Sequence, residues 1–151
     1  TWAAGGHAQI GLGVDKEGFV HLVPYRRGLS EAPPAPPNMI YYRSTNPHDP
    51  ASMEATYMVA PDEPNPGYPH FFNAPDGTLF FEFRQGGSGS GNHLVNKYDT
   101  ATRTWERMPT LLDGRGQMSA YGGPRLGPDG RWHCLWMWRD TPHADTNHTL
   151  S

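Results

Sequence analysis

The sequence is short of cysteine, of net charge and of long apolar runs, and each shortage excludes a class of protein. With Cys134 as its single cysteine, the chain cannot form an intrachain disulfide. A formal net charge of −3 argues against a general nucleic-acid-binding protein. No apolar stretch is long enough to cross a membrane as a helix. Helical periodicity is not sustained over three turns anywhere, so the sequence does not predict a helical fold.

Turn-forming and aromatic residues are abundant. The chain contains 18 glycines and 16 prolines without low-complexity repetition. Aromatic residues are also plentiful, whereas disordered chains avoid them. This composition predicts many short strands joined by turns.

An acidic turn that ends in glycine recurs at Gly18, Gly77 and Gly130, with spacings of 59 and 53 residues. About four expected strands accompany each turn. These strands cover residues 8–14, 19–25, 38–44 and 53–59, then 69–73, 78–84, 93–98 and 104–108, then 119–126, 132–139 and a strand that starts at Thr146. A repeated four-stranded antiparallel unit is typical of an all-β fold, the β-propeller, although its usual period is about 40–50 residues, so these blades carry long loops.

The repeats predict one domain that holds about two and a half propeller blades, at residues 1–60, 67–112 and 117–151. Such a number does not close a ring. The sequence begins at Thr1 without a visible signal peptide and stops at Ser151 inside an expected strand. We therefore expect it to be a fragment of a longer protein.

The hairpin in residues 67–96 predicts a functional site. Tyr68 begins its first strand and Arg84 ends its second, so the chain returns to the same edge of the sheet. A Gly/Ser-rich loop, GGSGSG, follows Arg84. A cation, a phenol and a loop that lets a ligand approach the backbone indicate a binding site rather than core.

Several motifs together resemble one family. They are GHAQIGLGVDKEGFVHL, YYRSTNP, the block YPHFFNAPDGTLFFEFRQGGSGSGNHLVNKYD followed by Trp105, and then SAYGGP and LWMWRDTP with TNH. The chain in this respect resembles the BNR-type (bacterial neuraminidase repeat) propellers, a family that includes the ulvan lyases. The most specific piece is the loop at residues 84–92.

This resemblance implies a polysaccharide lyase that cleaves a uronate-containing, ulvan-like acidic polysaccharide by β-elimination. Such chemistry needs a cation on the sugar carboxylate, a base and an acid. Arg84 looks like the neutralising cation, because its guanidinium is always charged and matches a carboxylate. Tyr68 and His7 look like the groups that transfer protons, and Tyr121 like a substrate contact. We expect the neighbouring guanidinium to lower the pKa of the Tyr68 phenol.

One departure from the ulvan lyases lies after the second expected strand, where they carry a second histidine and this chain has Arg26 and Arg27. An arginine cannot shuttle protons at neutral pH. This pair is expected either to bind a further anionic group of the polymer or to be a solvated charge pair. Further candidates for substrate binding are Asn92, which also suits a loop cap, and Arg139, which ends a strand as Arg84 does.

No cofactor is required for this chemistry, but the resemblance also implies a structural metal ion, zinc or calcium. His148 is the candidate ligand, with His143 and Cys134 nearby in the sequence, although no tight ligand spacing is present. His21 and the alternating Trp132, Trp136 and Trp138 are interpreted as structural residues.

Two other functions compete with the lyase. A sialidase-like glycoside hydrolase needs a carboxylate pair or a tyrosine with a glutamate, and the strand acids such as Glu82 form no obvious pair. A non-catalytic carbohydrate-binding propeller is favoured by Arg26 and Arg27 and disfavoured by the pair Tyr68 and Arg84. The expected partner is an acidic polysaccharide rather than nucleic acid or membrane, and the resemblance implies a secreted or periplasmic protein.

Overall fold

The computed structural model describes residues 7–27, 38–64 and 66–150, which form strands and one short 3-10 helix. In chain order the elements are β1 (His7–Val14), β2 (Val20–Arg27), β3 (Tyr41–Ser44), β4 (Met53–Thr56), β5 (Gly67–Asn73), β6 (Leu79–Gln85), β7 (Asn92–Asp99), β8 (Thr104–Arg107), β9 (Ser119–Leu126), β10 (Trp132–Arg139), η1 (Ala144–Thr146) and β11 (Asn147–Leu150). Within the described ranges, no helix is long and apolar enough to cross a membrane.

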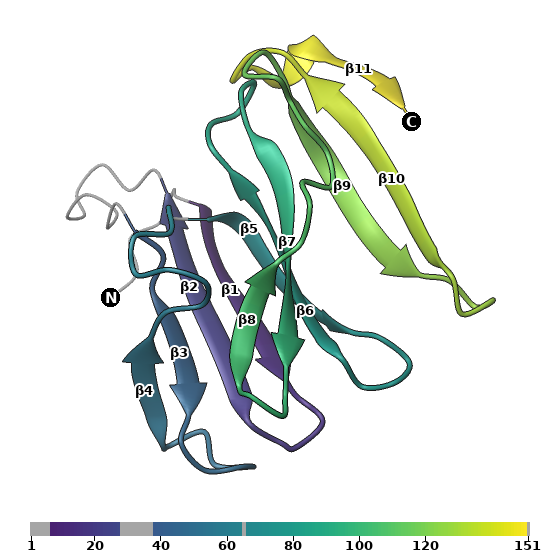
Figure 1. Cartoon of the computed structure of the whole chain (residues 1–151). Helices are drawn as coiled ribbons and strands as arrows, with labels where there is room; N and C mark the ends of the chain where they lie inside the picture. The colour runs from purple at the N-terminus through teal and green to yellow at the C-terminus, as the bar shows by residue number, and fades with distance from the viewer. Residues whose placement is uncertain (1–6, 28–37, 65, 151) are drawn as a thin grey trace.

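Consecutive strands form three antiparallel sheets, drawn side by side in Figure 1. The first sheet runs β1-β2-β3-β4, the second β5-β6-β7-β8 and the third β9-β10-β11. The first strands of the first two sheets, β1 and β5, pack against each other, and β7 of the second sheet contacts β9 of the third. This succession of meander sheets confirms the predicted all-β fold, a partial β-propeller.

The recurring acidic turns adopt one conformation. Gly18, Gly77 and Gly130 all have positive φ, at 89°, 82° and 72°. The aspartate ahead of each glycine accepts backbone N–H groups through its Oδ1: Asp15 from Glu17 and Phe19, Asp76 from Thr78, and Asp129 from Arg131. Because this backbone region favours glycine and this side chain suits the turn, the repeated motif fixes three hairpins locally.

Some strand ends differ from those expected. β3 begins at Tyr41 rather than at residue 38, because Asn38 forms only an isolated bridge with Pro64. β4 ends at Thr56, after which the chain places Met58 in the core. β5 begins at Gly67, two residues early, and its pairing with β6 shifts register between Gly67 and His70.

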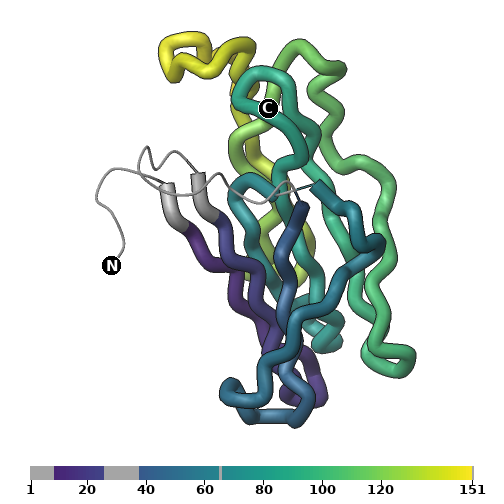
Figure 2. The backbone as a smooth tube through the Cα atoms, turned by 90° about the vertical axis from the view of Figure 1, so that its left-hand side faces the viewer, coloured from purple at the N-terminus to yellow at the C-terminus, as the bar shows by residue number. Residues whose placement is uncertain are grey.

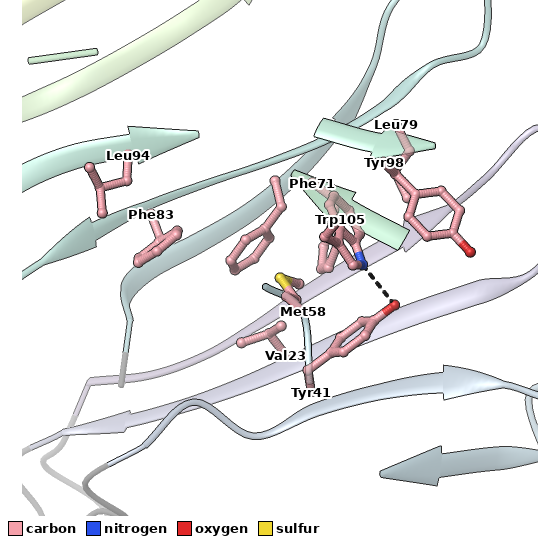
Figure 3. Packing of buried hydrophobic residues seen from close by; sticks show 10 residues of the cluster. Val23, Tyr41, Met58, Phe71, Leu79, Phe83, Leu94, Tyr98 and Trp105 are labelled. Atoms are coloured by element: carbon pink, nitrogen blue, oxygen red, sulfur yellow. Dashed lines mark hydrogen bonds between the residues drawn. The ribbon is translucent and has the colours of Figure 1, made fainter. Parts of the chain in front are cut away.

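The core lies between the first two sheets (Figure 3). The Trp105 Nε1–H donates a hydrogen bond to the Tyr41 hydroxyl at 3.1 Å, which links β8 to β3. Gly13 of β1 lets the strands approach closely, since a Cβ there would lie 2.7 Å from the Phe71 Cβ. The core cluster consists of apolar and aromatic side chains from both sheets: Val23, Tyr41, Met58, Phe71, Leu79, Phe81, Phe83, Leu94, Tyr98 and Trp105.

The third sheet is less covered than the other two. Among its residues, only Ala120 belongs to the buried apolar set, and Trp132, Leu135 and Met137 of β10 are exposed. Its contact with the second sheet includes the loop after β6, since Gly89 lies against the backbone of Asp140 and Thr141. Figure 2 shows this teal loop beside the yellow C-terminal segment. The edge between the second and third sheets is where the predicted site lies.

Candidate functional site

A cavity of about 240 Å³ lies where the second sheet meets β1 and β9. Its walls combine cations, histidines, two phenols and one carboxylate. The lining residues are Gln9, Tyr68, His70, Glu82, Arg84, His93, Ala120, Tyr121, Gly122 and Arg125. Three of the residues predicted for the site, Tyr68, Arg84 and Tyr121, therefore line one cavity.

Strand β6 separates the core from the cavity, because its side chains alternate between the two. Leu79, Phe81 and Phe83 alternate on the face that packs into the core. Glu82 and Arg84 occupy the opposite face, and both are buried as well. The strand register then sets Glu82 beside His70 of β5 and Arg84 beside His93 of β7. Alternation along one strand thus separates a core face from a charged face.

Arg84 is a buried cation without a carboxylate partner among the described residues. It is 2% exposed, and its Nη1 donates to the Tyr121 hydroxyl at 2.7 Å. Its guanidinium carbon lies 5.0 Å from the Tyr68 ring centroid and 5.2 Å from that of Tyr121. Its Nε is buried without a hydrogen-bond partner. Because an unpaired buried charge is costly, this arrangement favours an anionic ligand.

Tyr68 lies at the bulge that starts β5, and its backbone has φ 55°. A non-glycine residue in this region is uncommon and is often held there at a functional site. The expected lowering of its phenol pKa was wrong. Burial and the neighbouring Tyr121 raise the pKa of Tyr68, and together they outweigh the charge of Arg84. Tyr68 therefore keeps its proton and is a proton donor rather than a phenolate.

Tyr121 has the opposite behaviour. Burial alone would raise its pKa, but the hydrogen bond with the Ser88 hydroxyl and the charge of Arg84 outweigh burial, so the pKa of Tyr121 is lowered. The Arg139 guanidinium carbon lies 3.9 Å from the centroid of its ring. Ser88, which forms the hydrogen bond with the Tyr121 hydroxyl, belongs to the glycine-rich loop, and the sequence did not indicate this role. Arg84 acts to lower the pKa of both phenols, but the net shift is downward for Tyr121 and upward for Tyr68.

Glu82 is the centre of a cluster that sequence reasoning did not predict. Its carboxylate accepts hydrogen bonds from His70 Nδ1 at 2.8 Å, His93 Nε2 at 3.1 Å and Arg125 Nη1 at 2.7 Å. Burial opposes ionisation, but the bonds from His70, His93 and Arg125 lower the pKa of Glu82 to about 2. Gly123 of β9 permits this packing, since a Cβ there would lie 2.5 Å from Glu82 Oε2.

The ionised Glu82 also fixes the protons on both histidines. A carboxylate only accepts hydrogen bonds, so the ring nitrogen that faces it must carry hydrogen. Neutral His70 then holds its hydrogen on Nδ1 and has a lone pair on Nε2. The signal in the sequence was alternation: His70 lies two residues after Tyr68, and Glu82 two residues before Arg84.

The other residues predicted for the site either lie away from the cavity or have side chains outside the described part of the structure. The backbone of His7 pairs with Arg27 and that of Ala8 with Arg26, while the side chains of His7, Arg26 and Arg27 lie outside the described part of the structure. Asn92 does not line the cavity; its Oδ1 accepts the Gly114 N–H at 2.9 Å, as a loop cap does. His21 is fully buried in the core, as interpreted from the sequence.

The C-terminal histidines form no metal-ligand group within the described residues. His148 Nε2–H donates a hydrogen bond to Asp140 Oδ1 at 2.8 Å, and both side chains are exposed. Burial raises the pKa of the Cys134 thiol. A metal ion at His148 remains a prediction.

The chain is similar in sequence to a family of known proteins and to several individual ones. The sequence model of a family described as "BNR repeat-containing family member" matches residues 2–151. The long isoform of an ulvan lyase from Glaciecola sp. (strain KUL10) is 45% identical over 57 residues, which are 38% of this chain and 6% of that protein. The corresponding enzyme from Pseudoalteromonas sp. (strain PLSV) is 47% identical over 38 residues, 25% of this chain and 4% of that one.

Two solved structures share the fold. The crystal structure of the polysaccharide lyase Uly1 matches with a TM-score of 0.67 and 20% identity, over 88% of this chain and 36% of that chain. A structure described as a PL25 ulvan lyase matches with a TM-score of 0.66 and 16% identity, over 89% of this chain and 32% of that one. The chain therefore spans about a third of the length of these lyases.

Proposed function

The chain belongs to the BNR repeat-containing family, and from this membership and its charged cavity we propose that it is part of a polysaccharide lyase. The substrate is an acidic polysaccharide that contains uronate, as ulvan does, and the reaction is β-elimination. The ulvan lyases among its relatives and structural neighbours support this class of activity. A polymer of this kind is met outside the cell, so we expect a secreted or periplasmic protein.

The observation that carries the proposal is the buried guanidinium of Arg84, which has no carboxylate within salt-bridge distance among the described residues. A uronate carboxylate matches this cation in charge and in geometry. Neutralising the carboxylate makes the neighbouring C–H acidic and stabilises the enolate-like transition state. Electrostatic stabilisation of this kind is usually the largest single contribution to catalysis.

Tyr68 is proposed as the acid that protonates the leaving oxygen, because its phenol holds its proton beside the cation. Tyr121 is proposed to orient Arg84 and to contact the sugar. His7 remains a prediction for proton transfer, and Arg26, Arg27 and Arg139 remain predictions for binding anionic groups of the polymer. Arg139 lies against Tyr121, which supports a place beside the cavity.

A non-catalytic carbohydrate-binding propeller is the second candidate. The observation that favours it is the pair Arg26 and Arg27, where the resemblance implies a histidine. A sialidase-like hydrolase is less well supported, because Glu82 is the only carboxylate among the described lining residues and three donors already bind it.

The test is elimination itself, measured on the protein in its full natural length. Ulvan and a panel of other uronate polymers are incubated with the protein, and the ultraviolet absorbance of the unsaturated sugar is followed. Arg84→Ala is expected to lower the rate by about 100- to 1,000-fold, as the loss of a transition-state donor does. Arg131→Ala, a change to an exposed arginine on a turn, is the matched control and is expected to keep the wild-type rate.

The outcomes separate the candidates. Absorbance that rises with the wild type and not with Arg84→Ala supports a lyase with Arg84 in its site. New reducing ends without unsaturated product would favour a hydrolase. Neither product on any polymer, with retention on an immobilised acidic polysaccharide, would replace the lyase by the binding propeller.

A further inference from the structure

The pair formed by His70 and Glu82 offers a further group that could react with the substrate in the cavity. This inference rests on the proposed lyase activity. We propose that His70 is the base of the elimination: its Nε2 takes the proton from the carbon beside the uronate carboxylate, and Glu82 positions its ring. His70 and Arg84 line the same cavity, so a carboxylate bound by Arg84 lies in the space that His70 faces.

The hydrogen bonds of His70 suit a base. Its Nδ1–H donates to Glu82 Oε1 at 2.8 Å, and its Nε2 has no hydrogen-bond partner among the described residues. The imidazole therefore presents a lone pair while its ring orientation is fixed from behind. A carboxylate in this position holds the reactive tautomer and stabilises the imidazolium that forms when the base accepts a proton.

His93 shares the same carboxylate but is less suited to the role. Its Nε2–H binds Glu82 Oε2 at 3.1 Å, and its side chain is 8% exposed, against 44% for that of His70. The backbone of His93 is also tied to Leu111 and Leu112 by hydrogen bonds. His93 is therefore a second donor that holds Glu82 in place, whereas His70 is accessible to a ligand and to solvent.

Tyr68 supplies the other half of the reaction. It lies two residues before His70 on the same strand, and both line the cavity. Because burial keeps its phenol protonated, Tyr68 is suited to donate rather than to accept. A base and an acid with opposite proton occupancy at rest are what an elimination requires.

The step balances as follows. The C–H bond beside the carboxylate breaks and its proton binds His70 Nε2, while the electron pair forms a carbon–carbon double bond. The C–O bond to the neighbouring sugar breaks, and the leaving oxygen takes the proton of the Tyr68 hydroxyl. The proton on His70 then returns through solvent to the tyrosinate, which restores both groups. No oxidant, reductant or further reactant is consumed.

The charged and titratable groups around His70 come from several elements. On β5 there is Tyr68, and on β6 there are Glu82 and Arg84. β7 contributes His93, and β9 contributes Tyr121 and Arg125. Among these described groups only Glu82 is hydrogen-bonded to the His70 ring, so the charge of its carboxylate acts on the ring most directly.

The experiment compares histidine variants by rate and by pH profile on the polymer that the wild type cleaves. His70→Asn is the main variant, because the asparagine amide N–H can still donate to Glu82 while Nε2 is lost. We expect kcat to fall by about 100-fold or more, and the low-pH limb of the kcat/KM profile to disappear. His70→Ala is expected to regain activity when free imidazole is added.

Two other histidines are the controls. His93→Gln keeps an N–H at the position of Nε2, so a smaller loss with the low-pH limb retained is expected. His133→Asn removes a histidine that pairs with Asp129 outside the cavity, and its rate is expected to equal that of the wild type. Thermal unfolding of each variant distinguishes loss of the base from loss of the fold.

The results separate this inference from the proposed function. If the wild type cleaves polymer, Arg84→Ala does not, and His70→Asn matches the wild type, His70 is not the base and the lyase proposal stands. A slow His70→Asn that keeps the wild-type low-pH limb also overturns the base, since it indicates a structural role. Absence of elimination by the wild type overturns both proposals.

Discussion

His21 and His70 both lie beside a carboxylate, but they lie at different depths in the molecule. His21 is 0% exposed, and its Nδ1 lies 2.7 Å from the Tyr41 hydroxyl and its Nε2 3.5 Å from Asp15 Oδ2. His70 lies at the cavity, with its Nδ1 on Glu82 and nearly half of its side chain exposed. A histidine beside a carboxylate is thus fully buried in the first sheet, whereas in the second sheet it is open to the cavity.

The pKa shifts of His21 and Glu82 have different physical causes. Burial among the rings of Tyr98 and Trp105 lowers the pKa of His21 to about 4, and it outweighs the charge of Asp15. In the cavity, His70, His93 and Arg125 lower the pKa of Glu82 to about 2 despite burial. The core therefore keeps a neutral histidine, whereas the cavity keeps an ionised carboxylate.

A third pair extends the comparison to the surface. His148 and Asp140 are in contact at 2.8 Å, and about half of each side chain is exposed, whereas the Glu82 side chain of the cavity pair is buried. Exposed pairs of this kind typically contribute only about 0–1 kcal/mol to stability. The three pairs together predict that effects on stability decline from the core to the surface and that effects on activity are confined to the cavity.

The largest effect on stability is expected for His21→Asn. The smaller side chain leaves a cavity among packed rings and loses the contact of Nε2 with Asp15 Oδ2, so the free energy of unfolding should fall by about 3 kcal/mol. His70→Asn should change it by less than about 1 kcal/mol, because the hydrogen bond to Glu82 is retained. Chemical denaturation of both variants measures the difference. Equal losses would remove the distinction between core and cavity.

The next effect is a loss of stability in mild acid. The unfolded chain binds a proton at His21 below about pH 6.5, whereas the folded chain does so only below about pH 4. Stability from the neutral histidine is therefore complete above pH 6.5 and is lost as the pH falls toward 4. The loss should reach about 3 kcal/mol and should be absent in His21→Leu, as unfolding curves across this range would measure.

Glu82 serves as the control for the predicted loss of stability in mild acid, because it titrates over a lower pH range. Its ordinary pKa of 4.5 falls to about 2 in the folded chain, so its contribution is present above pH 4.5 and is lost as the pH falls toward 2. Glu82→Gln should therefore flatten the curve below pH 4.5 and leave the range from 6.5 to 4.5 unchanged. A single merged transition in every variant would contradict the separation of the two pairs.

A smaller effect is expected for Tyr121→Phe. The variant removes the hydroxyl that accepts a hydrogen bond from Arg84 Nη1 at 2.7 Å and leaves the ring between Arg84 and Arg139. Because one hydrogen bond to a charged group is lost, kcat/KM on the cleaved polymer should fall by about 10-fold. Ser88→Ala, which keeps that bond, is expected to lower it less. A loss as large as that of Arg84→Ala would give Tyr121 a direct role.

The smallest effect is expected for His148→Ala. Since its pair with Asp140 is exposed, the free energy of unfolding should change by less than about 1 kcal/mol. Differential scanning calorimetry with and without a chelator measures this change and also tests the predicted structural metal ion. If the chelator lowers the melting temperature of the wild type and His148→Ala abolishes that response, His148 is a metal ligand. Its contact with Asp140 would then not be a simple exposed ion pair.

Much of the fold followed from local signals. The acidic turns at Gly18, Gly77 and Gly130 were predicted from their repetition, and each joins two paired antiparallel strands. The exact strand ends could not be predicted from local signals, because the bulge at Tyr68 and the inward turn at Met58 depend on packing between sheets. Arg84, Tyr68 and Tyr121 were predicted from motifs, but Arg125 was not, since it reaches Glu82 from the third sheet.

The sequence by itself determined the hairpins, their repetition and the edge at which a cation and a phenol meet, because turns and alternation act over a few residues. Only the tertiary structure decided how these groups are ionised. It buried Arg84 without a carboxylate and raised the pKa of Tyr68 rather than lowering it. It also brought His70 and Glu82 into one cluster. Desolvation and charge depend on neighbours from three sheets, and those neighbours are far apart in the chain.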